Sequence, residues 1–124
     1  MSVIAVVVAV VILAALSVLQ ILVAAGRPYG RLVWGGQHRV LPARLRIGSV
    51  VAVLIYVAFA VVLFWRAGKT WPPNAFADIA TWVMFAYFVL GTVLNAISRS
   101  RPERLVATPA CAVLAVCTFI VAIG

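Results

Sequence analysis

The amino-acid sequence predicts an all-α integral membrane protein, a four-helix bundle with both termini outside (N-out/C-out). Hydrophobic residues make up 67% of the 124-residue chain and charged residues only 10%, whereas about a quarter of a typical soluble domain is charged. Four apolar runs have roughly the 20 residues that a helix needs to cross a bilayer. Eight of the ten basic residues lie in the first and third gaps between these runs.

The apolar runs predict four spans within a single transmembrane domain, residues 1–124: about 2–25, 46–65, 76–97 and 106–123. No Lys or Arg precedes the first run, which is also longer than the apolar core of a signal peptide, so we expect a retained span. The third span follows Pro72, Pro73 and Asn74, which together form a helix start signal.

The basic residues predict the orientation of the bundle. Lys and Arg accumulate in short loops on the cytoplasmic side of a membrane, so the loops at residues 26–45 and 98–105 are expected in the cytoplasm. The middle gap carries only Arg66 and Lys69. The net charge of +8, placed at the membrane ends, favours anionic lipid headgroups as partners and not nucleic acid.

The first loop is the longest non-spanning segment, and its arginines interleave with apolar residues. This mixture is typical of a segment in the headgroup layer, with apolar groups down and guanidinium groups on phosphates. A sharper alternative is a specific phosphate ligand, held by backbone N–H groups of Gly35 and Gly36 beside the arginines. Both interpretations stay open. The candidates for lipid or phosphate contact are Arg27, Arg31, Arg39, Arg44, Arg46 and Trp34.

Polar side chains within the spans form a second set of candidates: Gln20, Tyr56, Asp78, Tyr87, Thr92 and Asn95. Amide and phenol groups need partners in lipid, typically across a helix interface. These groups either join the helices or line a small binding cavity. Asp78, in the first turn of its helix, also complements the helix dipole. Because Gln20 and Asn95 lie at similar depth, we expect the first and third helices to pack together.

The sequence offers no constellation for catalysis, a metal or another cofactor. Cys111 and Cys117 point about 240° apart on a helix, so they cannot form a disulfide within it. They are interpreted as packing residues. His38 has no Cys, Asp or Glu nearby with which to form a metal or acid–base site. A non-enzymatic protein is therefore expected.

Two segments resemble an uncharacterised family of small four-span bacterial membrane proteins. The first loop carries the pattern of that family's first loop. The segment that runs from the end of the third span into the following gap carries the pattern of the family's third loop. The matching residues are 26–30 (Gly-Arg-Pro-Tyr-Gly), 35–36, 40–42 and 46–49, followed by 91–100 and 103–104. The resemblance implies multi-pass insertion in a bacterial cytoplasmic (inner) membrane and no particular activity.

The expected function is that of a non-enzymatic polytopic membrane protein. It acts through lipid contact, self-association or as an accessory subunit of a membrane complex, so a second copy or another membrane protein is an expected partner. The alternative is a small-solute transporter or channel subunit that works as an oligomer. No span carries a charged residue near its centre, which argues against proton-coupled transport.

Overall fold

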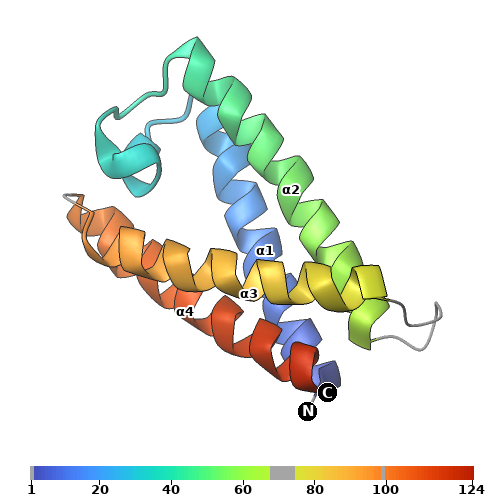
Figure 1. Ribbon diagram of the computed structural model, residues 1–124. Coiled ribbons are helices and arrows are strands. Elements are labelled where there is room, and N and C mark those ends of the chain that lie inside the picture. Colours follow the sequence, from blue (N-terminus) through green and yellow to red (C-terminus); the bar gives the residue numbers. More distant parts are fainter. Residues whose placement is uncertain (1, 68–74, 99) are drawn as a thin grey trace.

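The computed structural model describes residues 2–67, 75–98 and 100–124, and within them it contains α-helices, short 3-10 turns and no strand. The all-α prediction is confirmed. Each of the four α-helices is long and apolar enough to cross a membrane. This length and apolarity are those of a multi-pass membrane protein. The helices (Figure 1) are α1 (Ser2–Ala24), α2 (Ala43–Ala67), α3 (Ala75–Ala96) and α4 (Arg101–Ile123), and the turns are η1 (Gly30–Leu32) and η2 (Trp34–Gly36).

Two helices begin before the spans that apolarity predicts, α2 at Ala43 and α4 at Arg101. The difference arises because apolarity locates the lipid-crossing part of a helix, whereas capping locates its first residue. The Ser100 side chain caps α4 by accepting a hydrogen bond from the Glu103 N–H at 3.4 Å, and Pro102 lies in the first turn. The first turns of these helices are therefore polar extensions of apolar spans.

The helices form two hairpins, α1–α2 and α3–α4, which meet mainly where α1 packs on α4. Both basic loops lie at one end of the bundle and both termini at the other (Figure 1). The predicted packing of the first helix on the third is not the main contact of α1, because within the described residues α1 packs mainly on α2 and α4. The reason is that small residues of α1, Ala5 and Ala9, are buried in this contact and let the helix backbones approach.

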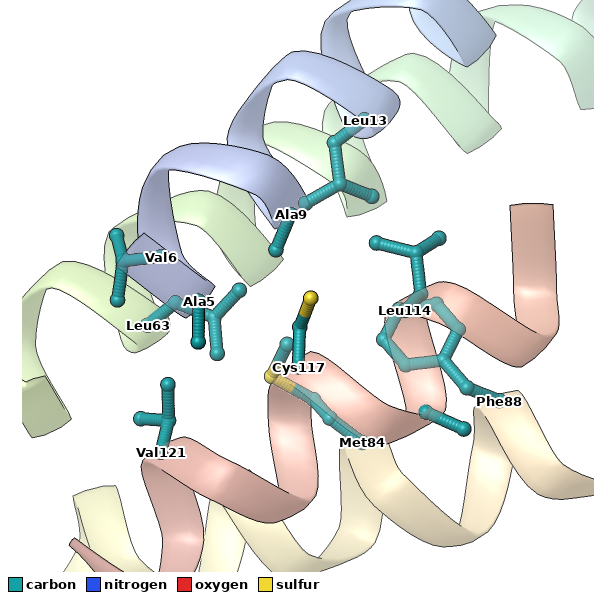
Figure 2. Close-up of a cluster of buried hydrophobic side chains, with 11 residues drawn as sticks. Ala5, Val6, Ala9, Leu13, Leu63, Met84, Phe88, Leu114, Cys117 and Val121 are labelled. Carbon is teal, nitrogen blue, oxygen red and sulfur yellow. The ribbon is translucent and has the colours of Figure 1, made fainter. Parts of the chain in front are cut away.

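The main core lies between the hairpins, on the side of the termini. Figure 2 shows the α1 side chains of this core facing those of α3 and α4. Close packing of this kind drives helix association in lipid, where the hydrophobic effect between helices is absent. The labelled core residues are Ala5, Val6, Ala9, Leu13, Leu63, Met84, Phe88, Leu114, Cys117 and Val121. The burial of Cys117 agrees with its interpretation as a packing residue.

Three threonines within the helices satisfy their hydroxyl groups locally. Each donates to the carbonyl four residues earlier: Thr81 to Ala77 at 2.7 Å, Thr92 to Phe88 at 2.8 Å and Thr118 to Leu114 at 2.7 Å. A hydroxyl in lipid needs such a partner. Thr92 therefore needs no group from another helix.

Arg66 ties three helices together at the end that carries the termini. Its Nε lies 2.7 Å from Oδ1 of Asp78, an ion pair between α2 and α3 without the alignment of a hydrogen bond. Its Nη2 donates to the carbonyls of Ala122 and Gly124 at 2.9 and 3.1 Å. A cation at this point also complements the dipole of α4. Asp78 thus joins two helices besides lying at the start of its own.

The first loop is folded against the bundle. Gly26, at φ +91°, ends α1, and the N–H groups of Gly26 and Arg27 bond back to Val23 and Leu22, as in a Schellman motif. Val33 and Leu41 of the loop are buried against Val23 in a second small core. The apolar residues of the loop are thus satisfied partly by the protein itself and not only by lipid.

Candidate functional site

A partly open cavity of about 240 Å³ lies between the two hairpins, beneath the first loop. Residues from all four helices and from the loop line it, because the hairpins meet closely only on the side of the termini and the loop packs over α4. Its lining consists of Leu16, Leu19, Gln20, Leu32, Val33, Trp34, Ala52, Tyr56, Tyr87, Phe88, Gly91, Asn95, Glu103, Val106, Ala107, Cys111 and Leu114.

The cavity brings together four of the six polar candidates within the spans: Gln20, Tyr56, Tyr87 and Asn95. They come from three different helices, so only the tertiary packing places them side by side. The other two candidates lie outside it: Asp78 pairs with Arg66, and Thr92 bonds to its own helix. Of the two interpretations left open by the sequence, the structure favours a cavity for the first four residues and helix joining for Asp78.

Gln20 is a buried polar group of the cavity, with 9% of its surface exposed. Its amide lies within reach of the Tyr56 hydroxyl across the α1–α2 contact. Its Oε1 is buried and has no hydrogen-bond partner within the described residues. Such an unpaired buried acceptor is costly, by about 1–3 kcal/mol. Gln20 is thus only partly satisfied by the protein.

Asn95 lies in the last turn of α3 and lines the cavity from the opposite hairpin. Its Nδ2 donates to Sγ of Cys111 on α4, at 3.4 Å. A thiol sulfur is a weak acceptor, so this contact holds the amide less firmly than a carbonyl would. Gly91, one turn earlier, lies beside the same sulfur, and a Cβ there would make an ordinary contact at 3.4 Å.

Aromatic rings form one wall of the cavity. Tyr87 and Phe88 meet Phe59 edge to face, each with ring centroids 5.4 Å apart, and they meet each other at 5.5 Å. Edge-to-face packing in this range is favourable. The three rings support one another, so Tyr87 and Phe88 present a fixed apolar surface to the cavity, against which a ligand can pack.

Trp34 closes the loop side of the cavity. Its Nε1 donates to Oγ of Ser49 at 3.1 Å, and its ring lies so close to Gly48 that a Cβ there would be 2.8 Å away. Its backbone has φ 53°, a costly conformation for a bulky residue. The docking of the indole on α2 holds this conformation. Trp34, which the sequence predicts as a lipid contact, is 44% exposed. It also covers the loop side of the cavity.

The candidate arginines of the first loop have different environments. The side chains of Arg27, Arg39 and Arg44 are exposed. Arg46 donates from Nε to the Leu41 carbonyl at 2.8 Å, and its guanidinium also lies over Gly26, so it fastens the two ends of the loop. The side chain of Arg31 lies outside the described part of the structure.

The specific phosphate site proposed from the glycines of this loop is not favoured. The N–H of Gly36 already donates to the Val33 carbonyl at 2.9 Å. It is therefore not free for a ligand. Arg27, Arg39 and Arg44, whose side chains are exposed, are the candidates that this part of the loop retains.

Sequence reasoning missed Glu103 and Cys111 as residues of the site. Glu103 is only 6% exposed and is already engaged with other groups. The spacing Ser100-x-x-Glu103 is that of a capping box, a signal that would have placed Glu103 at the start of a helix and not in a solvated loop. Within the described residues no group of three or more His, Cys, Asp or Glu side chains is placed to hold a metal ion.

The chain was compared with protein-family models, curated proteins and solved structures. None of them matches. Fold and site therefore rest on the residues of this chain alone.

Proposed function

We propose that the protein is a non-enzymatic multi-pass protein of a bacterial cytoplasmic membrane, and that its basic end binds anionic lipid headgroups on the cytoplasmic side. This proposal rests on one observation: the arginine side chains at the two ends of the bundle differ in exposure and in hydrogen-bond partners. Arg27, Arg39 and Arg44 of the first loop are exposed, and this loop lies beside the end of the bundle where α4 begins (Figure 1). At the other end Arg66 is engaged by Asp78 and by carbonyls of α4.

The charges of the first loop are strong enough for this role. Each arginine near an anionic membrane surface contributes about 1 kcal/mol, within a Debye length of about 8–10 Å. Tyr29 and Val40 of the same loop are 47% and 45% exposed. A phenol ring prefers the membrane interface. The loop thus offers both cations and apolar groups to the headgroup layer.

The bacterial setting of this proposal rests on the resemblance of the two loops to a bacterial family, and the orientation rests on the accumulation of basic residues in cytoplasmic loops. Self-association and membership of a larger complex are other forms of the same contact role. Self-association would appear as complexes of higher mass in the experiment below.

A second candidate is a small-solute transporter or channel subunit, which the cavity favours. A transport pathway along the third helix would have to follow its face between Asp78 and Asn95. Along this face Thr81, Met84 and Phe88 are buried in the core. The face is thus filled with packed side chains at its middle, and a continuous polar path along it is not favoured.

The lipid proposal is tested by changing Arg27, Arg39 and Arg44 together to Gln. We expect the variant to insert normally, since Arg31 and Arg46 still flank the spans, and to retain at least tenfold less anionic lipid, because about 1 kcal/mol per arginine is lost. Native mass spectrometry of protein extracted from vesicles of phosphatidylglycerol and phosphatidylethanolamine measures the lipid that is retained.

The matched control changes the same three residues to Lys, which keeps the charge and should keep most of the lipid. The difference between the Gln variant and the wild type should shrink at high salt, where exposed charges are screened. Equal retention of phosphatidylglycerol by the wild type and the Gln variant would show that the loop does not bind lipid.

A further inference from the structure

We infer that the cavity beneath the first loop is a binding site for a small neutral molecule that carries a hydroxyl group on an apolar ring, such as an alkylphenol. Three observations support this assignment: the size of the cavity, its aromatic wall, and the incompletely satisfied amide of Gln20. This site is separate from the lipid-binding arginines of the proposed function, since neither Arg27, Arg39 nor Arg44 lines the cavity.

The size of the cavity sets the size of the ligand. A dry protein cavity of about 150 Å³ accepts benzene. At about 240 Å³ this cavity is larger, so it has room for a ring with a short substituent, on the order of ten non-hydrogen atoms by that comparison. A whole lipid or a drug-sized molecule needs more volume, roughly 300–1,000 Å³.

The walls favour an aromatic or other apolar ring. Tyr87 and Phe88 present ring surfaces that Phe59 holds in place, and Leu16 and Leu114 lie among the remaining lining residues. Aromatic pairs contribute about 0.5–1.5 kcal/mol beyond the burial of their area, which corresponds to roughly two- to tenfold in affinity. A ring bound here can make such contacts without moving the core.

Gln20 supplies the preference for a hydroxyl group. Its Oε1 has no partner, while its amide has Tyr56 within reach. Gln20 lines the cavity, and rotation about its last side-chain torsion, which is soft for amides, can aim the oxygen at a ligand there. There it can accept a hydrogen bond from a ligand hydroxyl. Binding would thus satisfy a group that the empty protein leaves unpaired.

The ligand is expected to be neutral. The polar groups that line the cavity are mostly amides and hydroxyls, and Glu103 is already engaged with other groups. A charged ligand would lose its hydration without gaining an opposite charge, which costs several kcal/mol. A phenol or similar ring alcohol loses little on leaving the lipid, through which it would reach the partly open side of the cavity.

The inference is tested with two probes that differ only in the hydroxyl group, 4-propylphenol and propylbenzene. Equilibrium dialysis against the protein in nanodiscs, with empty nanodiscs subtracted, measures saturable binding apart from partition into lipid. We expect the wild type to bind 4-propylphenol roughly tenfold more tightly than propylbenzene, the effect of one hydrogen bond to a buried acceptor.

Two substitutions separate the contributions. Gln20→Leu should remove the preference for the hydroxyl while both probes still bind, and Gln37→Leu, the same change in the exposed part of the loop, should keep it. Ala52→Leu places a side chain in the cavity and should weaken both probes at least tenfold, whereas Ala58→Leu on the lipid-exposed side of α2 should not.

No saturable binding above empty nanodiscs, or an unchanged hydroxyl preference in Gln20→Leu, would overturn the inference. The first result would mean that water or lipid chains fill the cavity, and the second that a group other than Gln20 recognises the hydroxyl. The arginine-to-Gln variant of the first loop should bind both probes as the wild type does, so failure of the lipid proposal and failure of this site give different results.

Discussion

We expect Gly30→Ala to release the first loop from the bundle. Gly30 lies where the beginning of the loop meets its later part, and its N–H donates to the Arg39 carbonyl at 2.8 Å. A Cβ at this position would lie 2.1 Å from the His38 carbonyl oxygen and 2.8 Å from that of Arg39. Both atoms belong to the backbone, so no side-chain rotation relieves the clash, and the chain must separate here.

The expected loss of stability is about 1–3 kcal/mol, the usual cost of forcing extra atoms into packed structure. Because the loop carries Trp34 onto Ser49, its release should also open the cavity. Limited trypsin digestion of the purified protein measures the release as faster cleavage within residues 27–46. Thermal unfolding followed by tryptophan fluorescence measures the loss of stability.

Gly91→Ala is the matched control. A Cβ at Gly91 would make an ordinary contact with Cys111 Sγ at 3.4 Å, and alanine is the better helix former. This variant should keep the trypsin resistance of the loop. Equal cleavage rates in Gly30→Ala and Gly91→Ala would show that the loop does not pack as described.

The second large effect is expected from Arg66→Gln. Arg66 lies among three helices, where it pairs with Asp78 and donates to carbonyls at the end of α4. Hydrogen bonds to charged groups contribute about 1.5–3 kcal/mol when buried, and solvent exposure at this end reduces that. We expect a loss of about 1–2 kcal/mol, measured as a lower midpoint of thermal unfolding.

The two kinds of partner of Arg66, the Asp78 carboxylate and the α4 carbonyls, are expected to contribute unequally to the stability of the protein. The Asp78 side chain is 54% exposed and that of Arg66 only 20%, so the ion pair itself is largely solvated and worth little. Asp78→Asn should therefore destabilise the protein less than Arg66→Gln. If Asp78→Asn is the more damaging change, the carbonyls of α4 are not the main partners of Arg66.

The sequence was sufficient to predict the all-α class and the four candidate spans, because length and apolarity decide both. It also singled out Gln20, Tyr56, Tyr87 and Asn95, since polar groups in apolar helices are rare and need partners. It did not show which helices supply those partners. Alanine is abundant in every span, so the small residues that bring α1 onto α4 do not stand out in the sequence.

The first loop shows the other limit of sequence reasoning. Its arginines and glycines indicate a segment near the headgroups, but nothing local predicts that Trp34 adopts φ 53° and docks on Gly48. That conformation depends on a contact with a helix that begins later in the chain. Local preference, which disfavours it for a tryptophan, is overridden by tertiary packing.

The orientation of the basic end is the central claim, and the most direct measurement is labelling of single cysteines in intact cells with a membrane-impermeant thiol reagent. In a background with Cys111 and Cys117 changed to Ala, Gln37→Cys reports on the first loop and Gly124→Cys on the end of α4; both positions are exposed. The proposed orientation predicts labelling at position 124 and protection at position 37 until the cells are lysed. Labelling at position 37 with protection at position 124 would contradict it.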